Sequence, residues 1–257
     1  MATHDELRAR KLARITEMHR LDPQRTALLV IDMQRGFMDP DASMLVPEAW
    51  DVVPAIKKMV DVCRGVKIPV IFTEFVAAPE VPSLREDPFG PEHMVPVPGG
   101  PTGWGRRSGN CIVGTHGPES PDTIEELKPL PGELVVEGFS VDKFYGTNLD
   151  LALRGQDIRY LIMTGIMADI CVNATLLSAT IREYRVTALT DCITTIWPNI
   201  LEAVFDIWGR KFARLMTSDQ CIAELEEQRH ALRSEPGRPV SMAPAPYASA
   251  PAPAPHR

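Results

Sequence analysis

Short apolar runs alternate with helix-like stretches along most of the chain. The runs at 26–33, 68–75, 133–139, 158–165 and 185–192 are typical of strands in a parallel sheet. The stretches at 54–67, 147–156, 171–184 and 199–213 lie between or after them and carry apolar residues at helical spacing. Regular alternation of this kind is typical of parallel strands joined by right-handed crossovers. The pattern predicts a single-domain α/β fold, a parallel-sheet α/β/α sandwich over residues 25–228.

Three segments fall outside this alternation. Residues 1–24 form a charged N-terminal extension, in which an amphipathic helix over residues 1–20 is expected to pack on the body or on a partner subunit. Residues 77–117 are dense in proline and glycine, which predicts a lid or a binding loop. Residues 229–257 form a tail rich in proline and alanine, which is expected to be disordered.

Composition narrows the class of protein. The 257 residues are 44% hydrophobic, which is enough for a full core, and the net charge of −7 comes without any basic block, so no nucleic-acid partner is expected. No apolar run is long enough to span a membrane, and the start of the chain is charged throughout, so a cytoplasmic protein without membrane attachment is expected. The five cysteines are widely spaced, which favours reduced thiols over disulfides or a zinc site.

Two residues with potentially reactive side chains stand near the ends of predicted strands. Asp32 closes the first apolar run, and Cys171 follows the run at 158–165 where a helix should begin. Ligands of such sheets bind beyond the carboxyl ends of the strands. Asp32 is therefore either a reactive acid or the N-cap of the next helix. Cys171 is either a nucleophile, its pKa lowered by the helix N-terminus, or an inert packing residue.

Three stretches carry a resemblance to the isochorismatase-like cysteine hydrolases: ALLVIDMQRGF (27–37), FYGTNLDLALRGQDIRYLIMTGIMADICVNAT (144–175) and VTALTDCITT (186–195). The resemblance spans residues 25–222. It implies that Cys171 is the nucleophile, that Asp32 is its base, and that the Ile166–Met167 peptide is cis. It also implies an oxyanion hole built from the amides of Met167 and Cys171.

The same resemblance implies an activity and its setting. The expected reaction is hydrolysis of an amide, ureido or carbamoyl C–N bond of a small molecule through a thioester. The stretch FYGTNLD is most similar to the carbamoyl and ureido members. The metal-binding D-x-H cluster of related nicotinamidases is missing after the second run, so neither a metal nor another cofactor is expected. A homodimer or homotetramer is expected.

One position departs from the family pattern. The family's third catalytic residue is a lysine that falls here at Gly138, six residues before Phe144. Lys143 replaces it only if the chain turns or bulges between the two positions; otherwise Lys143 is a solvated lysine before a helix. Arg106 and Arg107 in the predicted lid are the other sources of positive charge, unless they are ordinary surface residues.

Other candidate residues have weaker support. Trp104 and Tyr145 are candidates for substrate binding or for plain packing. His93 and His116 lie in the irregular segment, and no G-x-S-x-G motif is present, which argues against a serine triad. Two alternative functions stay open: a binding or regulatory protein that kept the fold and lost turnover, and an isochorismatase-type vinyl ether hydrolase, although members of that type lack the cysteine.

Overall fold

A parallel sheet forms the centre of the protein. The computed structural model describes residues 3–42, 44–76, 111 and 113–234. Its strands pair in the order β3-β2-β1-β4-β5-β6, and every pair is parallel. The strands are β1 (Thr26–Ile31), β2 (Val70–Phe75), β3 (Leu134–Gly138), β4 (Tyr160–Gly165), β5 (Arg185–Ile193) and β6 (Ala213–Met216).

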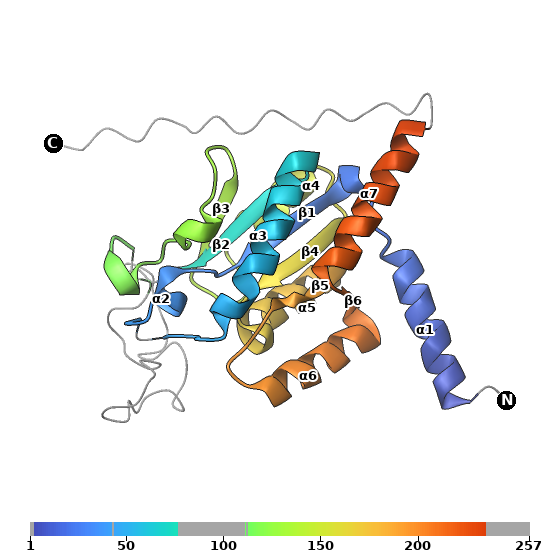
Figure 1. Ribbon diagram of the computed structural model, residues 1–257, viewed down its shortest axis with the longest axis horizontal. Coiled ribbons are helices and arrows are strands. Elements are labelled where there is room, and N and C mark those ends of the chain that lie inside the picture. The colour runs from blue at the N-terminus through green and yellow to red at the C-terminus, as the bar shows by residue number, and fades with distance from the viewer. Residues whose placement is uncertain (1–2, 43, 77–110, 112, 235–257) are drawn as a thin grey trace.

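Helices cover both faces of this sheet, as Figure 1 shows. One face carries α3 (Ala49–Val66) and α7 (Ser218–Ser234), and the opposite face carries α4 (Leu149–Gly155) and α5 (Asn173–Ile181). The remaining helical elements are α1 (His4–Met18), α2 (Arg35–Met38), α6 (Pro198–Ile207), the 3-10 turns η1 (Pro23–Arg25), η3 (Gly117–Glu119) and η4 (Glu125–Leu127), and the π-helical turns η5 (Ala168–Val172) and η6 (Trp208–Phe212). The predicted α/β/α sandwich is confirmed.

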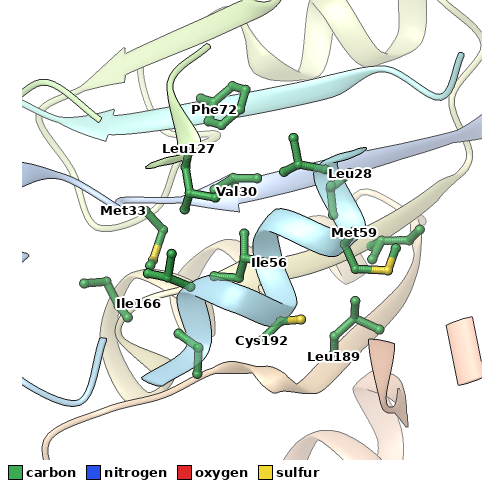
Figure 2. Packing of buried hydrophobic residues seen from close by; sticks show 14 of the residues in the cluster. Leu28, Val30, Met33, Ile56, Met59, Phe72, Leu127, Ile166, Leu189 and Cys192 are labelled. Carbon is green, nitrogen blue, oxygen red and sulfur yellow. The ribbon is translucent and has the colours of Figure 1, made fainter. Parts of the chain in front are cut away.

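The alternation of side chains along β1 builds two hydrophobic cores. Leu28 and Val30 point to the face under α3, where they pack with Ile56, Met59 and other buried residues (Figure 2). Ala27, Leu29 and Ile31 join the core under α4 and α5 on the other face. Each buried leucine, isoleucine, valine or methionine side chain contributes about 1.5–3 kcal/mol by leaving water. The sheet is therefore held by a hydrophobic core on each face, and residues at its strand ends have well-defined positions.

The C-terminal third differs from the sequence-based prediction. The helix expected over 199–213 ends at Ile207, and the chain passes through η6 into the edge strand β6. Trp208 explains the break, because its indole is fully buried and donates a hydrogen bond to Asn173 Oδ1 at 2.9 Å. Helix α7 was not predicted at all. It is mostly polar and continues to Ser234, beyond the expected start of the tail at residue 229.

The N-terminal helix α1 is present, but it buries no side chain. It contacts β6 and η6, stands to one side of the sandwich in Figure 1, and has Ile15 half-buried. Just after it, His19 anchors the chain, since its Nδ1 lies 2.8 Å from the carbonyl oxygen of Val186 in β5. In the described part of the chain, no helix combines the length and apolar character needed to cross a membrane. Most of the predicted lid and of the tail lies outside the described residues.

Candidate active site

Asp32 stands at the carboxyl end of β1, in the centre of the sheet. Its backbone has a φ of +52°, in the left-handed region that aspartate tolerates better than most residues. The side chain is 1% exposed. Thr73, on the neighbouring strand β2, donates a hydrogen bond from Oγ1 to Asp32 Oδ1 at 2.8 Å. The carboxylate is thus oriented by the sheet itself, and the N-cap alternative does not describe its contacts.

Lys143 reaches the same carboxylate from the segment between β3 and α4. Its Nζ lies 2.8 Å from Asp32 Oδ2, and its side chain is 0% exposed. The ammonium also donates to the carbonyl oxygen of Ser140 at 3.1 Å and lies 5.4 Å from the centre of the Phe75 ring. The alternative of a solvated lysine is therefore wrong. The chain turns after Gly138, as Lys143 requires in order to enter the site.

Helix α5 holds this turn in place. Lys143 donates its backbone N–H to Thr175 Oγ1 at 3.2 Å, and Ser178 donates its hydroxyl to Asp142 Oδ2 at 2.8 Å. The other oxygen of Asp142 accepts the backbone N–H of Phe144 at 2.9 Å. Both helix residues lie one or two turns after Cys171, so the lysine and the cysteine depend on one rigid element.

Cys171 lies in the π-helical turn η5, between β4 and α5. Turns of this type are frequent at functional sites. The side chain is 8% exposed, and the Ile166–Met167 peptide before it is cis, as the resemblance implies. The backbone N–H of Met167 forms a hydrogen bond with the thiol. The Met167 amide therefore faces the reacting sulfur.

The charges around the thiol act in opposite directions. Burial raises the pKa of the Cys171 thiol well above its ordinary value, and the Asp32 carboxylate raises it further, whereas Lys143 and the Met167 N–H lower it. The net direction is opposite to the lowered pKa expected from the sequence, because that expectation left out burial. Burial also lowers the pKa of Lys143, but the neighbouring Asp32 carboxylate outweighs it and leaves that pKa raised. The resting site therefore holds an ammonium, a carboxylate and a protonated thiol.

A glycine keeps the two central strands close at this point. Gly165 ends β4 directly beside Ile31, with a φ of +112°. A Cβ atom there would lie 2.1 Å from the carbonyl oxygen of Ile31, so any residue other than glycine would clash with the backbone of β1. The close approach sets the spacing between Asp32, which follows Ile31, and the Met167 peptide, which follows Gly165.

These groups border a small cavity with mostly apolar walls. Its free volume is about 20 Å³, roughly the room of a water molecule. Besides Asp32, Met167 and Cys171, the walls are formed by Phe37, Met44, Phe75, Val141, Ile166 and Ile170. A larger hollow of about 990 Å³ lies between α1 and the η6–β6 region, but none of the candidate catalytic residues lines it.

Other sequence candidates do not enter this description. Trp104, Arg106, Arg107 and His93 lie outside the described residues. Tyr145 is 73% exposed and does not border the cavity, and His116 is exposed. Across the described ranges, no group of three or more histidine, cysteine, aspartate or glutamate side chains is placed to hold a metal ion.

The structure adds residues that the sequence did not single out. Thr73 orients Asp32, the Ser140 carbonyl accepts from Lys143, and Thr175 and Ser178 hold the lysine segment. Thr73 had a usable signal, because a polar residue inside the buried run at 68–75 needs a partner, and Thr175 lies in the stretch 144–175 that carries the family resemblance. The others depend on a turn that no linear pattern indicates.

Fold and site together define a parallel α/β protein in which a buried acid, a lysine and a cysteine meet at the carboxyl edge of the sheet. The family model of the isochorismatase domain matches residues 26–220, and the chain belongs to this family. The family membership expected from the sequence is thus confirmed.

Individual relatives agree with this assignment. The chain is 29% identical over 212 residues to a protein of Pantoea ananatis named ureidoacrylate amidohydrolase RutB, an alignment that covers 77% of this chain and 81% of that protein. Its namesake in Caulobacter segnis is 27% identical over 205 residues, covering 73% of this chain and 80% of the relative.

Solved structures show the same fold. The N-carbamoylsarcosine amidase of Thermoplasma acidophilum superposes with a TM-score of 0.60 at 29% identity, covering 76% of this chain and 97% of that one. A cysteine hydrolase from Pseudomonas syringae superposes with a TM-score of 0.66 at 22% identity, covering 81% and 96% of the two chains.

Proposed function

We propose that the protein is a cysteine amidohydrolase that cleaves the C–N bond of a small amide, ureido or carbamoyl compound. The observation that carries this proposal is the buried pair of Asp32 and Lys143, joined at 2.8 Å beside Cys171. The names of the relatives, ureidoacrylate amidohydrolase and N-carbamoylsarcosine amidase, support the reaction class.

The reaction begins with a protonated thiol. As the Cys171 sulfur attacks the substrate carbonyl carbon, Asp32 takes the thiol proton, because it is the base in contact with the sulfur. Lys143 holds the carboxylate in place and offsets the negative charge that builds up at the sulfur and the carbonyl oxygen. In this proposal the amides of Met167 and Cys171 accept the developing oxyanion.

Two further steps complete the cycle. The tetrahedral intermediate collapses, the C–N bond breaks, and Asp32 returns its proton to the leaving nitrogen, which departs as ammonia or an amine. A water molecule, deprotonated by Asp32, then attacks the thioester carbonyl and releases the acid. The sulfur leaves as a thiolate and regains a proton from Asp32, so that each group ends in its starting state.

A binding protein without turnover is less well supported. A buried ion pair is costly to assemble, and its stabilising value is often small. Here the pair contacts the single cysteine that borders the described cavity. A vinyl ether hydrolase is also disfavoured, because the cysteine that such members lack is here placed against the base.

The test is ammonia release from a panel of small amides, ureides and carbamoyl compounds. We expect Cys171→Ala to abolish release while the circular dichroism spectrum stays unchanged. Cys63→Ala is the matched control, since Cys63 is another buried free cysteine but lies in the core under α3. Wild-type turnover by Cys171→Ala, or loss of activity in both variants alike, would contradict the cysteine mechanism.

A further inference from the structure

The walls of the cavity carry information about the substrate beyond its reacting bond. Five of the wall residues, Phe37, Met44, Phe75, Val141 and Ile170, have hydrocarbon or thioether side chains and line the cavity together with Asp32 and Cys171. In the part of the chain that the structure describes, no basic side chain borders the cavity. The surroundings of the reacting carbon are therefore apolar on the protein side.

Among the residues that the structure describes, the charged groups at the site are already paired with one another. The Asp32 carboxylate is already matched by the Lys143 ammonium at 2.8 Å, and the same ammonium donates to the Ser140 carbonyl. A carboxylate on the substrate would meet Asp32 as a like charge and would lose its water against aromatic and aliphatic walls. An ammonium on the substrate would find the acid already neutralised.

The aromatic part of the wall is held in a fixed position. Gln34 accepts the Phe75 backbone N–H at its Oε1 and donates from Nε2 to the Phe75 carbonyl oxygen, both at 2.8 Å. The Phe37 ring lies 6.3 Å from the Phe75 ring, centre to centre, in a tilted arrangement. Because these contacts exist without ligand, the Phe37 and Phe75 rings hold their positions before a substrate binds.

We propose that the enzyme acts on small uncharged amides or ureides whose non-reacting part is a hydrocarbon group, and that it discriminates against substrates with a carboxylate near the reacting carbonyl. This inference rests on the proposed function and narrows its substrate class. It separates this protein from the ureidoacrylate amidohydrolases that it resembles, because the substrate in their name is a carboxylic acid.

Isosteric pairs of compounds test the proposal. Isobutylurea and N-carbamoylglycine differ only in an isopropyl group against a carboxylate, and 4-methylpentanamide and succinamate form the same contrast among amides. We expect the isopropyl member of a pair to be hydrolysed with a kcat/KM at least about tenfold higher, since an unpaired charge in an apolar site costs more than 1.4 kcal/mol. The same member should protect Cys171 from iodoacetamide, measured by mass spectrometry of the Cys171 peptide.

The two readouts separate the two proposals. Ammonia release with equal or greater preference for the carboxylate members would overturn the apolar substrate class and leave the amidohydrolase intact. Protection of Cys171 by the isopropyl members without any ammonia release would uphold the apolar site and overturn the reaction. Absence of both protection and release would overturn both proposals.

A substitution in the wall provides an internal check. Val141 is half-buried at the cavity, so a longer charged side chain can replace it without being buried completely. Val141→Arg should shift the kcat/KM ratio of each pair toward the carboxylate member by about tenfold, as expected for one new charge-assisted contact. Val141→Met adds length without charge and should leave the ratio unchanged. An unchanged ratio in Val141→Arg would show that this wall does not select the substrate.

Discussion

Asp32 contacts two groups, the Lys143 ammonium and the Cys171 thiol, that have different roles in the proposed mechanism. Lys143 stabilises its negative charge, and in the proposed mechanism Asp32 accepts a proton from the Cys171 thiol. Asp32 raises the pKa of both Lys143 and the Cys171 thiol, whereas Lys143 lowers that of the thiol. Removing the charge of one of these residues changes the pKa of the others. The effect of Lys143 is therefore measured by comparing Asp32→Asn with the double variant that also carries Lys143→Met.

At the scale of residues, the pH dependence of alkylation reports the charge on Lys143. Burial raises the pKa of the Cys171 thiol in every variant, but Asp32→Asn removes the carboxylate that raises it further. The Cys171 thiolate then becomes the negative partner that keeps the buried Lys143 charged, and the ammonium in turn lowers the pKa of the thiol. The midpoint of iodoacetamide reaction should thus fall in Asp32→Asn relative to wild type. Adding Lys143→Met should raise it again by about 1 unit or more, the usual effect of one close charge.

The turnover of both variants should be low, because the base is missing in each. Lys143→Met keeps much of the length of the lysine stem, so a midpoint shift between the two variants reflects charge rather than packing. Identical midpoints in Asp32→Asn and in the double variant would show that the ammonium has no effect on the sulfur, and would remove Lys143 from the proposed mechanism.

At the scale of elements, the lysine segment and α5 act together. Ser178 is a positioning residue, since its hydroxyl fixes Asp142 and does not touch the reacting groups. Ser178→Ala should lower kcat about threefold to tenfold with little change in KM, because one net hydrogen bond is worth about 1 kcal/mol. It should also move the alkylation midpoint of Cys171 upward as Lys143 loses its fixed place.

Thr180→Val is the matched control, because that hydroxyl bonds to the Leu177 carbonyl within the same helix at 2.8 Å. Ser178→Ala removes the hydrogen bond to Asp142 and the one accepted from Arg182, and Thr180→Val removes one within the helix. A purely structural role of Ser178 would therefore change activity and midpoint in both variants in the same way. Equal changes would refute the positioning role.

The predictability of the elements follows their burial. The runs that form β1, β2, β4 and β5 are mostly buried. Strands buried on both faces are rich in apolar residues, so they can be recognised in the sequence. Strand β6 was missed because its four residues continue a helix-like stretch, and α7 because few of its side chains, such as Cys221 and Leu225, are fully buried.

The site was predictable only in part, for a related reason. Asp32 stands near the end of one predicted strand and Cys171 at the start of the helix predicted after another, so the topology alone brings them to the same edge of the sheet. The entry of Lys143 depends on a turn held by side chains of α5, which are distant in the sequence. Phe37 and Met44 come from a stretch between β1 and α3 that has no periodicity, and nothing in the pattern indicates which way they face.

At the scale of the whole molecule, α1 offers a surface for self-association. We propose that the chain forms a homodimer or homotetramer through the hollow beside α1. Leu7 is 54% exposed, Leu12 is 42% exposed, and Ile207 across the hollow is 52% exposed. Exposed apolar side chains gathered along one groove are typical of subunit interfaces.

Leu7→Glu combined with Leu12→Glu should reduce the mass in solution to that of one chain, 28.4 kDa, by light scattering after size-exclusion chromatography. Leu151→Glu is the control, because Leu151 is 77% exposed but belongs to α4 on another side of the molecule. A wild-type protein that already has the mass of one chain, or a double variant that keeps the larger mass, would contradict an interface at α1.

The two hydrophobic cores each support a different part of the candidate active site. Ile166 and Met167 belong to the core under α3, whereas Cys171 belongs to the core under α4 and α5. Cys171, the proposed nucleophile, and the Ile166–Met167 peptide are thus supported from opposite sides of the sheet, across the close contact at Gly165. If the side chains packed on either face of the sheet move, Cys171 and the Met167 peptide move relative to each other. In the proposed mechanism the catalytic rate therefore depends on the packing of both cores.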